Sequence, residues 1–111
     1  MPITKIVFIR AKKGHEEALG GILLNLVQAA RLERGCLDYD LHRAVDDPAL
    51  WFLYQSWDTE NGFQAHLKKP AARACIRDAQ PMVEADMNLQ PFKMISQPVR
   101  RHFHDEDALA A

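Results

Sequence analysis

The sequence predicts one α+β domain whose elements run in the order strand, helix, strand, strand, helix, strand. Three observations support this order: a β-branched and aromatic segment at 3–11, a helical apolar stripe after it, and two strand-like segments around Asp46-Asp47-Pro48. β-branched and aromatic residues favour strands, whereas apolar residues at steps of three and four favour a helix. A chain of 111 residues has room for one such domain.

The first strand and the start of the first helix follow from local signals. Residues 3–11, ITKIVFIRA, are expected to form the strand, and Gly14 ends it. His15-Glu16-Glu17 opens the helix, because acidic side chains are stabilised near the positive N-terminal end of a helix. The apolar stripe of this helix consists of Leu19, Ile22, Leu23, Leu26, Val27 and Ala30.

The first helix is predicted to end near Gly35. Arg31 and Arg34 suit its last turn, and Gly35 suits the left-handed residue that stops a helix. Gly20 and Gly21 lie inside the helix, where each glycine costs about 1 kcal/mol relative to alanine. A close approach of the helix to the sheet would account for them.

The middle of the chain predicts a hairpin followed by two short helices. Residues 36–44 and 50–57 are the expected strands, and the Asp-Asp-Pro segment between them is typical of a turn. Asp58 or Thr59 is expected to cap the first short helix, and Pro70 to begin the second. The side chains predicted to face inward from these helices are Phe63, His66, Leu67, Ala72, Cys75, Ile76 and Ala79.

A final strand at 87–97 completes a domain predicted to span 1–97, and residues 98–111 are expected to form a loose tail. Pro91 cannot donate a backbone hydrogen bond, so this strand is expected at a sheet edge or with a bulge. The order β-α-β-β-α-β is the ferredoxin-like arrangement, an antiparallel four-stranded sheet with helices on one face.

The second face of the sheet is predicted to be covered by another copy of the chain. Residues 6–9 and 51–54 are apolar on both faces of their strands. Soluble monomers rarely expose a large apolar patch, so we expect a symmetric homodimer that packs sheet against sheet. The alternative is a tail that folds back, but its many charged residues suit that position poorly.

Charge and motif content exclude several classes of protein. A net charge of -1 without a basic cluster argues against a nucleic-acid partner. No apolar run has the length of a membrane span, and Lys5 and Arg10 interrupt any signal-peptide core, so a cytoplasmic protein is expected. Cys36 and Cys75 match no redox or metal spacing and are expected to be reduced and buried. Because the sequence contains no cofactor-binding motif, we expect the protein to use neither a cofactor nor a metal.

Three segments, GCLDYDLHR, DDPALWFLYQSWD and FQAHLKKP, resemble the antibiotic biosynthesis monooxygenase (ABM) family of dimeric α/β-barrel proteins. The resemblance extends over residues 3–97 and implies the same ferredoxin-like fold and a dimer. The family includes quinol monooxygenases, anthrone oxygenases and haem-degrading enzymes. Trp57 matches a pocket Trp of anthrone-type members, and His66 matches a His of quinol-type members. Phe63 stands where anthrone-type members carry Tyr, and the haem-binding positions of haem-degrading members differ in this chain.

The resemblance implies catalytic roles for His66 and Trp57. Histidine is the side chain best suited to accept a proton near neutral pH, and tryptophan offers an apolar wall with one N–H donor. Each residue could equally serve in ordinary core packing. The candidate substrate-binding residues are Tyr54, Phe63, Tyr39 and Arg77.

The function predicted from the sequence is a cofactor-independent monooxygenase that oxidises a small electron-rich aromatic, of the quinol or anthrone type, with O2. Without a cofactor, the reducing electrons must come from the substrate, and the protein supplies a proton acceptor and a dry pocket. Two alternatives stay open: a non-catalytic ligand-binding or accessory dimer, and an isomerase or processing enzyme of the same superfamily.

Overall fold

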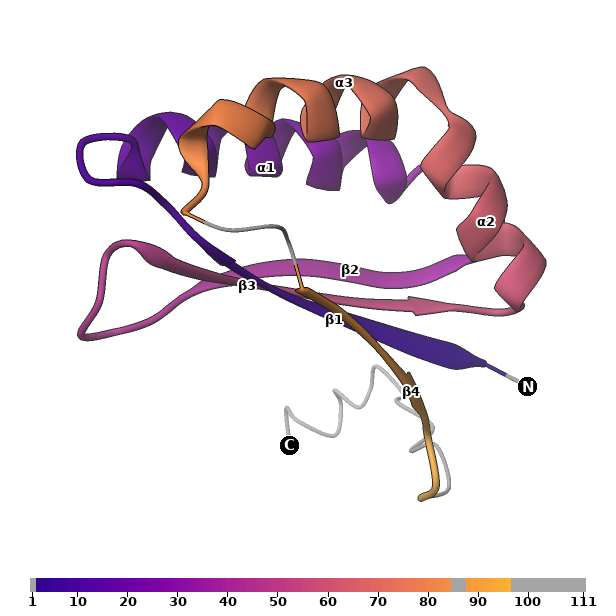
Figure 1. Cartoon of the computed structure of the whole chain (residues 1–111). Coiled ribbons are helices and arrows are strands. Elements are labelled where there is room, and N and C mark those ends of the chain that lie inside the picture. Colours follow the sequence, from indigo (N-terminus) through magenta and orange to yellow (C-terminus); the bar gives the residue numbers. More distant parts are fainter. Residues whose placement is uncertain (1, 85–87, 97–111) are drawn as a thin grey trace, which may run out of the picture.

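One four-stranded antiparallel sheet and a layer of helices on one of its faces make up the described part of the chain (Figure 1). The computed structural model describes residues 2–84 and 88–96. The strand order is β2-β3-β1-β4. This arrangement confirms the predicted ferredoxin-like α+β fold. The elements are β1 (Ile3–Arg10), α1 (Glu16–Ala30), β2 (Cys36–Arg43), β3 (Leu50–Trp57), α2 (Glu60–Lys68), α3 (Pro70–Ala79), the short 3-10 helix η1 (Gln80–Met82) and β4 (Asn88–Lys93).

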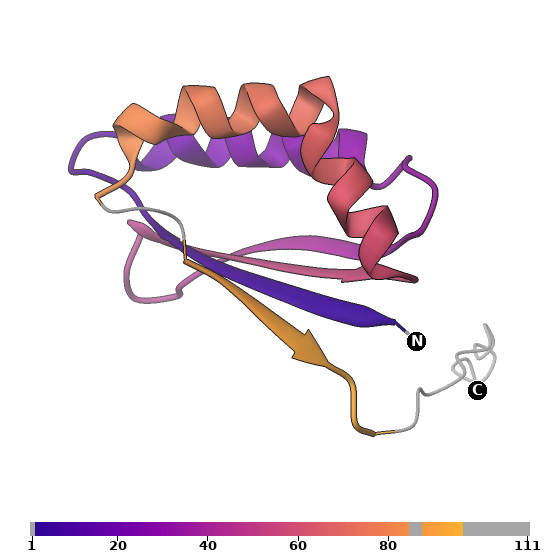
Figure 2. The same cartoon turned by 45° about the vertical axis from the view of Figure 1, so that its right-hand side comes forward.

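The helical layer has two parts (Figure 2). Helices α1 and α3 run side by side over the sheet, and α2 descends at one end toward β3. The core between the layers is formed by alternate residues of the strands and by one face of each helix. For example, Val7, Leu53 and Leu41 are register neighbours across three strands, and all three lie on the helix side.

Helix α1 ends earlier than the sequence predicts. Its last residue is Ala30, and the next residues form tight turns through bonds from the Leu32 and Glu33 N–H groups to carbonyls three residues back. The Arg31 guanidinium, predicted in the last helical turn, donates to the Tyr39 carbonyl instead, at 2.9 Å. Gly35 has the expected positive φ, +88°, but it lies in the turn that leads into β2. Because of this turn, the Glu33 side chain lies against His66 of α2.

The two glycines of α1 differ in their surroundings. A Cβ on Gly20 would lie 2.5 Å from Cζ2 of Trp51, whereas a Cβ on Gly21 would meet nothing within 4 Å. The predicted close approach of helix to sheet is therefore confirmed for Gly20. No contact explains Gly21.

The two short helices follow the predicted signals closely. The Thr59 hydroxyl accepts from the Gly62 N–H at 3.0 Å, and Pro70 occupies the first turn of α3. Lys69 has an extended backbone and separates the helices. One inward prediction holds only in part, because Ile76 faces the space between α3 and the sheet but is 44% exposed.

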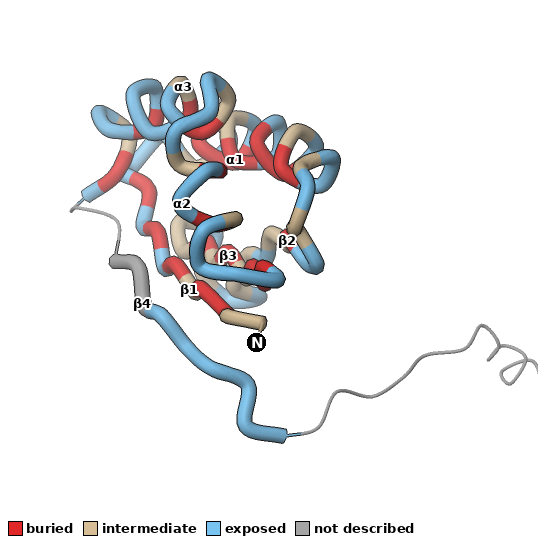
Figure 3. Tube along the Cα trace, turned by 90° about the vertical axis from the view of Figure 1, so that its right-hand side faces the viewer, coloured by how far each residue is buried: buried red, intermediate tan, exposed pale blue. Residues whose placement is uncertain are grey.

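The face of the sheet opposite the helices carries several large apolar side chains. Phe8 is 49% exposed and its ring lies 5.1 Å from that of Phe52, its register partner on β3. Phe92 on β4 is 51% exposed. Figure 3 shows this exposed strand at the border of the sheet. We call Ile6, Phe8, Phe52, Tyr54 and Phe92 the open face.

Within the described residues, strand β4 pairs only with β1 and so lies at the edge of the sheet, as Pro91 predicted. The strand predicted at 87–97 is shorter than expected, because β4 ends at Lys93 and residues 94–96 are not in a strand. Positions 87 and 97 and the predicted tail at 98–111 lie outside the described residues. Among the helices of the described part, none has the length and apolar character needed to cross a membrane.

Candidate functional site

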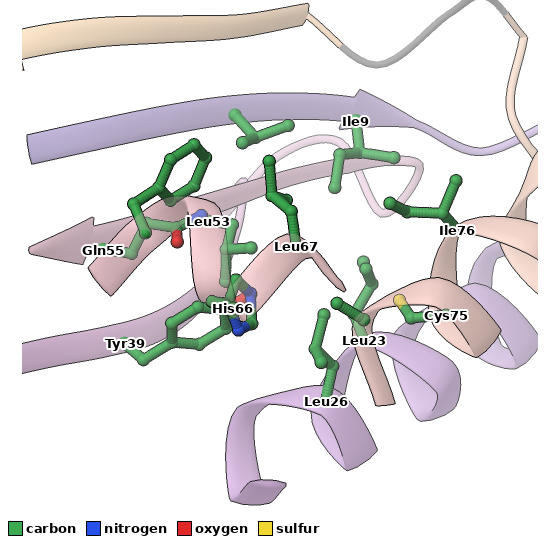
Figure 4. Close-up of a pocket in the computed structure, with 13 residues that line it drawn as sticks. Ile9, Leu23, Leu26, Tyr39, Leu53, Gln55, His66, Leu67, Cys75 and Ile76 are labelled. Carbon is green, nitrogen blue, oxygen red and sulfur yellow. The ribbon is translucent and has the colours of Figure 1, made fainter. Parts of the chain in front are cut away.

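A cavity of about 140 Å³ lies between the sheet and the helices (Figure 4). Most of its lining is apolar. Ile76 belongs to the lining and is partly exposed, which marks where the cavity meets the surface. The lining residues are Val7, Ile9, Leu23, Leu26, Tyr39, Leu53, Gln55, Phe63, His66, Leu67, Ala72, Cys75 and Ile76.

The polar groups of the cavity gather at one end. Tyr39 and Gln55 are register neighbours on β2 and β3, and Lys5 on β1 is the next residue in the same row. Because side chains alternate along a strand, all three lie on the helix side of the sheet. In Figure 4, Tyr39, Gln55 and His66 lie toward the opposite end from Cys75 and Ile76.

His66 is the centre of a buried hydrogen-bonded chain. Its Nδ1 lies 3.0 and 3.1 Å from the two carboxylate oxygens of Glu33, and its Nε2 lies 3.1 Å from the Tyr39 hydroxyl. His66 is 2% exposed and the Glu33 side chain 8% exposed. A buried carboxylate can only accept, so His66 carries a proton on Nδ1 and donates it to Glu33.

The hydroxyl of Tyr39 is the donor in the second bond of this chain. Burial, followed by the nearby Cys75 and Glu33, raises the pKa of the Tyr39 phenol well above its usual range. Tyr39 therefore stays protonated, and with the imidazole proton on Nδ1 its O–H donates to Nε2 of His66. The oxygen of Tyr39 keeps a lone pair for an incoming O–H group.

Trp57 lies behind His66 rather than in the cavity lining. It is fully buried, and its ring centroid lies 4.9 Å from that of His66. Its indole N–H, the expected donor to a ligand, donates instead to Oε1 of Gln55 at 2.8 Å. Trp57 thus contacts two residues of the polar end and fixes both.

Phe63 forms part of the cavity wall, and its ring makes a cation–π contact with the buried Lys5. The Lys5 ammonium lies 4.6 Å from the Phe63 ring centroid and 3.1 Å from a carboxylate oxygen of Glu60. The structure thus brings Phe63, Tyr39 and His66 together around one cavity.

Two of the predicted substrate-binding residues lie elsewhere. Tyr54 is on the open face, because it alternates with Leu53 and Gln55 along β3. Arg77 is at the surface of α3, where its Nε donates to Asp78 at 2.9 Å. Neither residue lines this cavity.

The cysteines offer no nucleophile at neutral pH. Burial, followed by the charge of Asp78, raises the pKa of the Cys75 thiol to about 11. Burial, followed by the carboxylates of Glu33 and Asp38, raises the pKa of Cys36 to about 11. Both thiols are free, as expected, although Cys36 is only half-buried. Three or more potential metal ligands do not cluster anywhere in the residues that the structure describes.

Comparison with known proteins shows the family of the chain. The profile of the family described as antibiotic biosynthesis monooxygenase matches residues 2–78. The chain belongs to this family. The ABM match ends within α3, so it includes Glu33, Gln55 and His66. No curated protein sequence matches the chain.

Solved structures share the ABM fold over most of their length. PA3566 from Pseudomonas aeruginosa is 28% identical, with a TM-score of 0.81 over 86% of this chain and 95% of that one. SO0527 from Shewanella oneidensis is 25% identical, with a TM-score of 0.77 over 82% and 88%. Rv0793 from Mycobacterium tuberculosis has a TM-score of 0.84 over 89% and 100% at 16% identity, which shows the fold alone.

Two residues of the site, Glu33 behind His66 and Gln55 in the cavity wall, were missed by sequence reasoning. Glu33 follows a helix whose end was placed too late, and it lies 33 residues from its partner His66. Gln55 lies between Tyr54 and Ser56, and a single amide in a strand gives no spacing signal. The alternation of Leu53, Gln55 and Trp57 on one face of β3 was the one signal that could have indicated it.

Proposed function

We propose that this ABM protein is a cytoplasmic, homodimeric monooxygenase that oxidises a small electron-rich aromatic with O2 and without a cofactor. The observation that carries the proposal is the chain of hydrogen bonds from Glu33 through His66 to Tyr39, which ends at an apolar cavity. A base at the end of a dry pocket is what an oxidation driven by a substrate anion requires.

The proton of the substrate has a defined path. A phenolic O–H donates to the Tyr39 oxygen, Tyr39 passes its own proton to Nε2 of His66, and the resulting imidazolium lies against the Glu33 carboxylate. The pair of opposite charges forms in a buried place, where each stabilises the other. His66 is the base, Tyr39 contacts the substrate, and Trp57 holds the imidazole from behind.

The anion then supplies the electrons. It passes one electron to O2, and the two radicals combine to form a C–O bond at the ring. The protonated hydroperoxide loses water, so that a quinol plus O2 gives a hydroxyquinone plus water. The substrate provides all four electrons, one oxygen atom enters the product and the other leaves as water.

The size of the cavity favours a quinol over an anthrone. A protein cavity of about 150 Å³ accepts benzene, which is close to the volume of this one, about 140 Å³. A single ring therefore fills the space, whereas a fused three-ring anthrone would have to protrude past Ile76. A second oxygen opposite the reacting one would point toward this partly exposed end.

The open face supports the proposed homodimer. Its aromatic side chains lie on a sheet surface that the helices leave uncovered. Packing two copies sheet to sheet would remove this apolar surface from water.

Oxygen uptake by metal-stripped protein tests the proposal. A panel of hydroquinones and anthrones is compared with autoxidation alone and with His66→Ala and Trp57→Phe. We expect saturable uptake with single-ring quinols, its loss in His66→Ala and a reduction in Trp57→Phe. Absence of uptake above autoxidation across the panel would overturn the monooxygenase assignment. Unchanged turnover in both variants would overturn the assignment of the site.

An isomerase is the second candidate, because the same proton relay works without an oxidant. A substrate whose absorbance changes equally with and without air would favour it. Binding of aromatics without either reaction would favour the accessory role.

A further inference from the structure

The amide of Gln55 is a buried donor that the proposed proton relay does not use. Gln55 is 3% exposed, lines the cavity and lies on β3 directly beside Tyr39. A buried side-chain amide normally finds partners for both of its ends.

The orientation of this amide is fixed by Trp57. An indole N–H can only donate, so the atom that it contacts at 2.8 Å must be the carbonyl oxygen of Gln55. The NH2 group of Gln55 therefore points the other way. It makes no hydrogen bond to another residue in the ranges 2–84 and 88–96, and it belongs to a side chain in the cavity wall.

The surroundings favour an anion in front of this donor. The next residue in the same row is Lys5, whose ammonium lies against the Phe63 ring that forms the neighbouring wall. On the other side, Tyr39 and His66 take up the proton that a bound phenol gives away. A donor and a proton acceptor thus lie side by side at the closed end of an apolar cavity.

We propose that the Gln55 NH2 group binds and stabilises the oxyanion of a phenolic substrate, and that Trp57 is the positioning residue that aims it. The inference rests on the proposed function and names its substrate class: a single-ring phenol with its ionising oxygen between Gln55 and Tyr39. The O–H bond of the phenol breaks, its proton moves through Tyr39 to His66, and the negative oxygen accepts from Gln55. Removal of one oxyanion donor of this kind typically lowers kcat by a factor of about 10²–10³.

The test is the ionisation of bound 4-nitrophenol, whose anion absorbs visible light. Gln55→Glu is nearly isosteric and keeps the oxygen that accepts from Trp57, but it replaces the donor by a second oxygen. We expect the fraction of bound probe present as anion, at a fixed pH near neutral, to fall at least tenfold in Gln55→Glu. Gln55→Leu should show a similar loss without an added charge, which separates the missing donor from repulsion.

Two further variants complete the test. Gln28→Glu makes the same chemical change at an exposed site on α1 and should leave the bound anion unchanged. Trp57→Phe keeps the donor but removes its anchor, so it should lower the anion fraction less than Gln55→Leu does. Circular dichroism and thermal melts confirm that each variant is folded.

The outcomes separate this inference from the monooxygenase proposal. Failure of the wild-type protein to bind 4-nitrophenol, or equal anion fractions in wild type, Gln55→Glu and Gln55→Leu, would overturn the role of Gln55. Loss of the anion in both Gln55 variants supports it, whether or not oxygen uptake is found. The oxygen-uptake panel then decides the reaction independently.

Discussion

The adjacent glycines of α1 provide a sharp test of how closely this helix approaches the sheet. Alanine at either position gains about 1 kcal/mol in helix propensity. At Gly21 nothing opposes the gain, since an added Cβ meets no atom within 4 Å. Gly21→Ala should therefore raise the free energy of unfolding by about 1 kcal/mol.

Gly20→Ala should have the opposite effect. Its Cβ would lie 2.5 and 2.6 Å from two ring carbons of Trp51, whereas carbon atoms pack at about 3.5–4.0 Å. The indole is rigid and has the Arg43 guanidinium 4.5 Å from its ring, so it must shift as a whole. Overpacking of this kind costs about 1–3 kcal/mol, which leaves Gly20→Ala less stable than wild type by about 1 kcal/mol.

Urea denaturation measures the difference between the two variants. With a slope of about 1–3 kcal/mol per molar, a gap of about 2 kcal/mol separates the two midpoints by roughly 1 M. Adding Trp51→Leu should make Gly20→Ala favourable again, because leucine lacks the distal ring atoms; a double-mutant cycle isolates this term. If Gly20→Ala stabilises the protein as much as Gly21→Ala does, the close contact with Trp51 does not exist.

Three further predictions concern the site and the open face. Glu33→Gln keeps an acceptor for His66 but removes the negative charge. The hydrogen bond to the protonated imidazole is then weaker by about 1–2 kcal/mol. The rate of oxygen uptake should therefore fall about tenfold. Phe8→Asp places a charge on the open face, so light scattering should give the mass of one chain, 12.7 kDa, where wild type gives a dimer. The raised pKa of Cys36 and Cys75, about 11 for each, keeps both thiols protonated at neutral pH. Their alkylation by iodoacetamide should therefore accelerate about tenfold per pH unit up to that value.

Each of these predictions has a control or a contradicting result. Glu17→Gln changes an exposed carboxylate on α1 and should leave oxygen uptake unaltered. A wild-type protein that scatters light as a single chain would refute the dimer directly. Rapid alkylation at neutral pH in the folded protein would show that the thiols are neither buried nor held protonated.

Much of the fold could be predicted because its signals are local. The capping residue Thr59, the first-turn Pro70 and the strand segments at 3–10 and 50–57 all act through neighbours in the chain. The apolar stripe of α1 indicated its buried face for the same reason, since helical periodicity is a property of consecutive residues. The partial exposure of Ile76, which lines the cavity, was not predictable, because it depends on how closely α3 docks on its neighbours.

The sequence by itself determined the fold class, the order of the elements and three residues of the cavity: Tyr39, Phe63 and His66. Only the tertiary structure decided which partners these residues have. Glu33 meets His66 from 33 residues away, and the indole of Trp57 donates to the carbonyl oxygen of Gln55. Hydrogen bonds of this kind depend on distances of a few tenths of an ångström between separate elements, and such distances are set by how helices and sheet pack rather than by any local pattern.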